Sequence, residues 1–387
     1  MRFRELEFQD LVDFYDNKRV PLSSLERENM QGPYRYYGAQ GVIDYINNYI
    51  FDGEFVLVAE DGANLVTRKE PIAQIARGQF WVNNHAHVVS AKKGISTNTF
   101  INVLLNSNNL SGYVTGAAQP KLSQSNLRKA KFVVPNYAIQ REIDRIICAY
   151  NDLIENNRRR IQLLEESARL LYREWFVYLR FPGHEHVKVV GSVPEGWDYL
   201  PLPDAVEINS RTPVEKNKAI SYVPMSSLSE TGMTVDISDF EIREKHTNVK
   251  FIKNDTLLAR ITPCLENGKT AFVYFLEEDD VACGSTEFIV LREKQLPPEY
   301  IYCLSRSYEF REHAIKSMTG SSGRQRVQVS AFNDYYVYVP PKGLLEQFNE
   351  FAKNCFAQIK LLTRQNTQLT NARDLLLPRL MNGDISV

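Results

Sequence analysis

Thr115-Gly116-Ala117-Ala118 is the stretch on which the fold depends, because it returns in altered form as Thr319-Gly320-Ser321-Ser322, 204 positions further along the chain. About twenty residues after each copy comes a short run rich in valine and aromatic residues that ends in proline, at 131–135 and 336–340. Each run leads into a long segment with helical periodicity. The pattern therefore predicts an internal repeat, in which a strand-rich unit is followed by a helix.

The two segments that follow these prolines carry apolar residues in steps of three and four, with one asparagine in each seam. The seam positions are Ile139, Ile143, Ile146, Tyr150, Ile154, Asn157, Ile161, Leu164, Ala168, Leu171 and Trp175 in the first, and Leu344, Phe348, Phe351, Cys355, Ile359, Leu362, Asn366 and Leu369 in the second. This period predicts two long helices with a coiled-coil seam. At 1.5 Å per residue, the roughly 40 residues of the first helix span about 60 Å. Its single apolar stripe needs a helix of similar length to cover it, which predicts an intramolecular antiparallel pair.

The segments before the two helices are rich in predicted strands and turns. Strands are predicted at 54–59 and 80–89 in the first copy and at 255–260 and 286–291 in the second, with Gly and Asn marking the turns. The predicted fold class is α+β, with mixed α/β domains, two long antiparallel coiled-coil helices and a pseudo-twofold internal repeat. The predicted domain order is a first domain at 1–137, a central helix at 138–182, a second domain at 183–341 and a C-terminal helix at 342–387.

Composition and charge narrow the class of protein. The chain has 387 residues, of which 43% are hydrophobic and 24% charged, which is typical of a folded protein with more than one core. It has no apolar run of about 18 residues and no signal-like beginning, so a cytoplasmic location is predicted. Five cysteines stand singly and are interpreted as reduced and structural: Cys148, Cys264, Cys283, Cys303 and Cys355. The net charge is only -1, but residues 116–134 and 320–329 contain basic residues and no acid, at matching places in the repeat.

Catalytic and metal-binding motifs are missing from the sequence. Gly268-Lys269-Thr270 resembles the end of a phosphate-binding loop, but the first glycine of that loop is replaced by Pro263. No Asn-Pro-Pro-aromatic run is present to hold an adenine for methyl transfer, and no Gly-x-Ser-x-Gly elbow is found. His85 and His87 would share one face of a predicted strand, but no further ligands stand nearby. A hydrogen-bonded pair is favoured there over a metal site, with DNA contact as a third possibility. These absences indicate a recognition protein that is not an enzyme and holds no metal.

Two variable α/β domains, each followed by a long helix, resemble the specificity subunits of type I restriction-modification enzymes. The resemblance covers nearly the whole chain. Its strongest parts are the helical stretches 140–146, 151–157 and 163–176, the C-terminal stretch 375–384, the Val-Pro-Glu-Gly-Trp run at 193–197, the run 37–41 and the two Thr-Gly loops.

The resemblance implies a division of labour within a larger complex. Each target-recognition domain reads one half of a split, asymmetric DNA site, and the helix pair sets the distance between the halves. The helices also dock two methyltransferase subunits, which bind S-adenosylmethionine and methylate adenine. Restriction subunits that use ATP and magnesium translocate and cut unmodified DNA. This chain itself would hold no cofactor.

Polar residues in loops at strand ends are the candidate DNA contacts. Amides that could pair with adenine are Gln40, Asn64 and Gln119; cations that could contact guanine or phosphate are Arg260, Arg324 and Arg326; and Lys121 and Lys269 are expected to bind phosphate. The subunit interface is predicted at the helix seams, with Ile154, Ile161, Leu164, Leu171, Ile359, Leu362 and Leu369. The polar helix faces, with three arginines at 158–160 and the pair Glu165-Glu166, face either solvent or a partner subunit.

Two other functions are compatible with parts of the sequence. A coiled-coil scaffold with two protein-binding domains is the main alternative, and the acid-free basic loops at matching places speak against it. A standalone DNA-modifying enzyme is opposed by the missing motifs.

Overall fold

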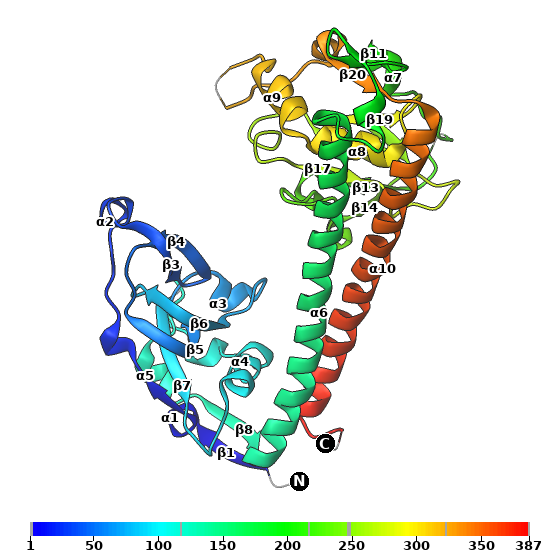
Figure 1. Ribbon diagram of the computed structural model, residues 1–387. Helices are drawn as coiled ribbons and strands as arrows, with labels where there is room; N and C mark the ends of the chain where they lie inside the picture. The colour runs from blue at the N-terminus through cyan, green and yellow to red at the C-terminus, as the bar shows by residue number, and fades with distance from the viewer. Residues whose placement is uncertain (1–2, 117, 216, 246–248, 322, 386–387) are drawn as a thin grey trace. The chain divides into compact units, whose positions relative to one another are not determined.

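The computed structural model describes residues 3–116, 118–215, 217–245, 249–321 and 323–385 (Figure 1). Two compact units make up the chain, Met1–Ile154 with Gln368–Val387 as unit 1, and Glu155–Thr367 as unit 2. Each of the two long helices therefore contributes residues to both units. These helices are α6 (Tyr137–Tyr172), which continues as a π-helical turn at Arg173–Val177, and α10 (Lys342–Met381).

Unit 1 is built on a six-stranded sheet in the order β2-β7-β5-β6-β3-β4. Neighbouring strands are antiparallel, except that β3 and β6 are parallel. The strands are β2 (Val12–Phe14), β3 (Gln31–Gly38), β4 (Gly41–Ile46), β5 (Phe51–Ala59), β6 (Ala73–Val82) and β7 (Ala86–Ala91), and β1 (Phe3–Glu7) pairs separately with β8 (Lys131–Pro135). The α-helices besides α6 and α10 are α1 (Phe8–Leu11), α2 (Ser24–Glu28), α3 (Asn64–Thr67), α4 (Asn98–Ser107) and α5 (Gln124–Arg128).

Unit 2 repeats part of this plan with two four-stranded sheets, β12-β19-β16-β17 and β14-β13-β18-β15. The first sheet contains β12 (Val206–Ile208), β16 (Thr256–Ala259), β17 (Thr270–Phe272) and β19 (Phe288–Glu293), and the second contains β13 (Ile220–Val223), β14 (Glu241–Arg243), β15 (Val249–Ile252) and β18 (Val281–Gly284). Short two-stranded pairs are β9 (Val189–Val190) with β10 (Val193–Pro194), and β11 (Asp198–Pro201) with β20 (Tyr336–Val339). The remaining α-helices are α7 (Leu202–Ala205), α8 (Pro298–Arg306) and α9 (Tyr308–Lys316).

The order of elements confirms the internal repeat. In both units a strand that precedes the Thr-Gly loop by a long stretch pairs with the proline-ended strand after that loop, β1 with β8 and β11 with β20. In both units, too, a central strand lies between two antiparallel neighbours, β5 between β6 and β7, and β16 between β17 and β19. The α+β class with two long helices is therefore confirmed.

The long helices run antiparallel within each unit. In unit 2 the amide of Asn157 donates a hydrogen bond of 3.0 Å to the amide oxygen of Asn366, and the Phe176 and Phe348 rings lie 5.1 Å apart. The two seam asparagines predicted from sequence thus bond to each other. In unit 1 the last turns of α10 add Leu380 and Met381 to a core that includes Ile143 and Ile147 of α6.

Two details of the helix prediction are wrong. Phe351 is 42% exposed, and Ala352 and Phe356 are buried instead, because unit 2 covers that side of α10 with other aromatic rings such as Phe272. Glu165 was assigned to a polar outer face, but only 4% of it is exposed. Its carboxylate accepts hydrogen bonds from the Tyr302 hydroxyl and the Met233 N–H.

The strand prediction over 80–89 is also wrong, because the run is two strands. β6 ends at Val82 and β7 begins at Ala86. The side-chain oxygen of Asn83 accepts a hydrogen bond of 2.8 Å from the backbone N–H of His85, a local turn that competes with the ladder.

Two smaller findings complete the fold. Within the described ranges, no helix combines the length and the apolar character that a membrane crossing requires. The five cysteines are free, and three of them are buried, as a structural role predicts.

Candidate nucleic-acid interface

One edge of the central sheet carries the predicted loops in each unit. In unit 1 the end of β5 lies beside the start of β7, with Ala59 opposite Ala86. In unit 2 the end of β16 lies beside the start of β19, with Ala259 opposite Phe288. Because these strand pairs are antiparallel, the residues that follow one strand and precede the other meet at the same edge.

The Thr-Gly loops close at these edges with the same backbone pairing. Thr115 and Lys121 exchange two backbone hydrogen bonds, of 2.8 and 2.7 Å, and Thr319 and Arg326 do the same at 3.0 and 2.9 Å. Lys121 and Arg326 are therefore equivalent positions. Residues 117 and 322 of the two motifs lie outside the described residues.

The glycines of these loops have a steric reason. Gly116 and Gly320 have φ of 85° and 129°, a region that other residues rarely adopt. A Cβ atom at Gly116 would lie 2.4 Å from the carbonyl oxygen of Gln119. The tight closure of the loop requires glycine there.

The residue after each cation ties the loop to the end of the central strand. The Leu122 N–H donates to the Glu60 carbonyl at 2.8 Å, and the Val327 N–H donates to the Arg260 carbonyl at 2.9 Å. Glu60 and Arg260 are thus equivalent in the backbone, although one side chain is an acid and the other a base.

In unit 1 the edge is organised around the Glu60 carboxylate. It accepts a hydrogen bond of 2.8 Å from Nη1 of Arg19 and lies 3.2 Å from Nζ of Lys121. Burial alone would raise the pKa of Glu60, but the Arg19 hydrogen bond and the charges of His87 and Arg19 lower it below its usual value. Glu60 therefore stays ionised and partly neutralises Lys121.

The two histidines do not share a strand face, which corrects the sequence prediction. His85 lies in the turn, half-exposed, with Nδ1 2.7 Å from a carboxylate oxygen of Asp61. His87 is buried on β7, and its ring nitrogens lie 2.7 Å from Asp16 and 2.7 Å from the Leu122 carbonyl. Both are hydrogen-bonded as predicted, but not as a pair. Among the described residues no group of three or more metal-ligating side chains forms a metal site.

In unit 2 the edge is organised around two arginines. Arg326 binds the Glu287 carboxylate through Nε and Nη2, at 2.9 and 2.8 Å. The hydrogen bonds that Arg326 donates to this carboxylate raise the pKa of Arg326. Arg260 donates from Nη2 to the side-chain oxygen of Gln328 at 3.0 Å. Sequence reasoning missed Glu287 and Gln328, and likewise Glu60, because none belongs to a local motif.

The other predicted DNA contacts differ in exposure. Gln40, in the turn between β3 and β4, is exposed, as are Gln119 and Arg324 in the Thr-Gly loops. Lys269 is half-buried, and its ammonium donates to the Met225 carbonyl at 3.0 Å. The Lys269 ammonium is thus hydrogen-bonded within the chain, which argues against a phosphate contact.

The prediction that Asn64 contacts a base is wrong, because this residue is only 6% exposed. Its side-chain amide donates to the Glu70 carbonyl at 2.8 Å and accepts from the Glu70 N–H at 3.0 Å. The side chain holds the loop after α3 and has no free edge for a base.

The sequence and the fold of this chain are similar to those of known proteins. A family model described as the type I restriction modification DNA specificity domain matches residues 3–166. The MjaIX specificity subunit of Methanocaldococcus jannaschii, a type I restriction enzyme subunit, is 25% identical over 84% of this chain and 78% of its own length. A putative type I specificity subunit of Haemophilus influenzae, S.HindORF215P, is 31% identical over 44% of this chain and 43% of its own length. The crystal structure of the type I S subunit from M. genitalium has the same fold, with a TM-score of 0.59 at 13% identity over 98% of this chain and 96% of that one.

Residues 3–166 match the type I restriction-modification DNA specificity domain, and the chain as a whole is similar to type I specificity subunits. The resemblance stated from the helical stretches is thereby confirmed.

None of the seven seam residues predicted as the subunit interface is fully exposed. Ile154, Ile359 and Leu362 are at most 4% exposed, so they hold the helices within their units and present no surface to a partner. Ile161, Leu164, Leu171 and Leu369 are half-buried. The exposed large apolar side chains on α6 and α10 are Leu153, Leu163, Leu170, Phe351, Leu361 and Leu375, and only Phe351 among them was a predicted seam position.

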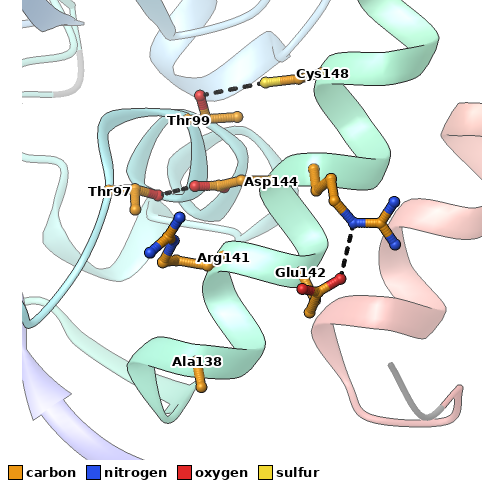
Figure 2. Close-up of a pocket in the computed structure, with 8 residues that line it drawn as sticks. Thr97, Thr99, Ala138, Arg141, Glu142, Asp144 and Cys148 are labelled. Carbon is orange, nitrogen blue, oxygen red and sulfur yellow. Dashed lines mark hydrogen bonds and ion pairs between the residues drawn. The ribbon is translucent and has the colours of Figure 1, made fainter.

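A hollow in unit 1 lies between α4 and the first turns of α6 and has a volume of about 660 Å³ (Figure 2). The Thr97 hydroxyl donates a hydrogen bond to Asp144 there, and Cys148 lies 3.9 Å from the Thr99 hydroxyl. Burial, and to a smaller extent the charge of Glu54, raise the pKa of Asp144 to about 6. The lining of the hollow contains both cations and carboxylates, so it offers no basic surface for DNA. The contacts at the hollow join α4 to α6.

Proposed function

We propose that this specificity subunit reads a bipartite, asymmetric DNA site and directs partner subunits that methylate or cut DNA. The observation that carries the proposal is the pair of sheet edges, which share their backbone hydrogen bonds but differ in side chains. Lys121 stands where unit 2 has Arg326, and Glu60 stands where it has Arg260. Equal scaffolds with different polar groups are what reading two different half-sites requires.

The catalytic work is assigned to partners. Two methyltransferase subunits would bring S-adenosylmethionine, and restriction subunits would bring the ATP- and magnesium-dependent steps, while this chain would act in the cytoplasm without catalysing a reaction. The exposed leucines on the long helices support docking of methyltransferase subunits, because leucines such as Leu163 and Leu361 are 52% and 56% exposed. A scaffold that binds only proteins would leave the basic, glycine-closed loops without a role.

Methylome sequencing tests the proposal. A host that lacks other methyltransferases would express this chain with its cognate methyltransferase, and the modified adenines would be mapped. We expect one motif with two specific parts separated by a spacer of fixed length. The substitutions Lys121→Ala and Arg324→Ala serve as a matched pair, since each should weaken methylation through a different unit. Absence of modification that depends on this chain, or a motif with a single continuous part, would contradict the proposal.

A further inference from the structure

The Glu287 carboxylate holds Arg326 from one side only. Its two oxygens accept from Nε at 3.0 and 2.9 Å and from Nη2 at 2.8 Å. The two side chains are 39% and 24% exposed, so the pair lies at the surface of the sheet edge. The backbone of Arg326 is fixed as well, by its two hydrogen bonds to Thr319.

This arrangement leaves the outer edge of the guanidinium unoccupied by strong bonds. Arginine has five N–H donors in a planar fork, one on Nε and two on each Nη atom. Glu287 uses the Nε donor and one Nη2 donor, and Nη1 makes a long contact of 3.4 Å with the Arg324 carbonyl. The remaining Nη1 and Nη2 donors are parallel and match the O6 and N7 acceptors of guanine in the major groove.

Charge distinguishes the roles of the two arginines in this loop. The Arg326–Glu287 pair is neutral overall, which suits a neutral base edge better than a phosphate. Arg324 is exposed, and no ion pair to it occurs among the described residues, so we expect this residue to contact a phosphate.

We propose that Arg326, positioned by Glu287, reads one guanine in the half-site recognised by unit 2. The inference rests on the proposed function and adds to it a base and a pair of residues. Unit 1 has no such reader at the equivalent position. Lys121, next to Glu60, has a single ammonium group without a fork, and it can contact a phosphate but cannot make the bidentate guanine pair.

The experiment uses the full chain assembled with its methyltransferase. Once the motif is mapped, each guanine is replaced in turn by 7-deazaguanine, which lacks the N7 acceptor, and binding is measured for wild type and Arg326→Lys. Arg326→Lys keeps the charge and removes the fork. We expect one guanine of one half-site to lose about 5- to 150-fold of its discrimination, with the salt dependence of affinity unchanged.

Glu287→Gln tests the positioning role. Glutamine offers one acceptor oxygen, so it can accept from only one of the two N–H groups. The discrimination for guanine in Glu287→Gln should therefore be intermediate between that of wild type and that of Arg326→Lys. Glu60→Gln is the matched control, because it removes the carboxylate that faces Lys121 and should leave every guanine position strict. The 7-deazaguanine effect should also disappear at that guanine when Arg326→Lys is already present, which mere loss of folding would not produce.

The outcomes separate this inference from the proposed function. A motif whose half-sites both remain strict in Arg326→Lys overturns the guanine assignment and leaves the proposed function intact. A half-site for unit 2 without any guanine does the same. A wild-type complex that binds all DNA sequences alike would overturn the proposed function itself.

Discussion

Glu165 is a single carboxylate whose removal should strongly destabilise unit 2. Although it lies on α6, it accepts a hydrogen bond of 2.5 Å from the Tyr302 hydroxyl on α8 and one of 2.8 Å from the Met233 N–H. Both donors are fully buried. Burial and the nearby charge of Glu165 raise the pKa of Tyr302, so the phenol stays protonated and remains a donor.

The substitution Glu165→Ala removes two hydrogen bonds and leaves two buried donors without an acceptor. An unsatisfied buried polar group costs about 1–3 kcal/mol, so the two donors together give a loss of about 2–6 kcal/mol in the free energy of unfolding. This is a large part of the total stability of a domain, which is about 5–15 kcal/mol. Glu165→Gln keeps one acceptor oxygen and should lose roughly half as much.

Urea unfolding followed by near-UV circular dichroism would measure these losses. Glu166→Ala is the control, because Glu166 is exposed and its replacement should change stability by at most about 0.5 kcal/mol. If Glu165→Ala and Glu166→Ala unfold at the same urea concentration, the reasoning about the buried carboxylate is refuted.

Three further predictions concern the helices. Leu361→Asp, at a 56% exposed position, should abolish methyltransferase binding on gel filtration without lowering the melting temperature. Leu362→Asp, at a 3% exposed position, should cost several kcal/mol of stability. Equal melting temperatures for the two variants would count against this difference. The pKa of Asp144 is raised from 3.8 to about 6, so between these pH values the folded state binds a proton at Asp144 that the unfolded state has lost. The contribution of Asp144 to stability is therefore full below pH 4 and is lost as the pH rises through 6. Asp144→Asn should therefore gain stability over wild type at pH 7.5 relative to pH 4, and melting curves at both pH values check the sign. Asn157→Leu with Asn366→Leu should match or exceed wild type in stability, while Asn157→Leu alone should be less stable; melting curves that show additive effects would contradict coupling of the two amides.

The period of the seam was enough to predict the helix pair, and the reason is visible in its interior. Ile143, Asn157 and Ile359 are buried, because a helix face that repeats every three or four residues has only one way to be covered. The same rule failed at Phe351, since the side of α10 that is covered in unit 2 depends on the rings of other elements, which the helix sequence does not contain.

The reading residues were less predictable, because polar side chains in loops can serve the loop itself. Asn64 has the amide that could contact a base, but both the nitrogen and the oxygen of this amide are hydrogen-bonded to the Glu70 backbone. Glu287 gave no signal at all, since its partner Arg326 is 39 positions away and the pairing exists only after the sheet edge has formed.

The use of Leu380 and Met381 in the core of unit 1 has a consequence for synthesis on the ribosome. These residues pack in the same core as Ile143 and Ile147, from which about 230 positions separate them. At a translation rate of about 5–20 residues per second, the first unit waits roughly 10 to 50 s for its last core residues, while unit 2 has all of its own at residue 367. The part of the chain made first is therefore completed last, and a chain that stops after residue 367 but before Leu380 contains all of unit 2 and lacks these core residues of unit 1.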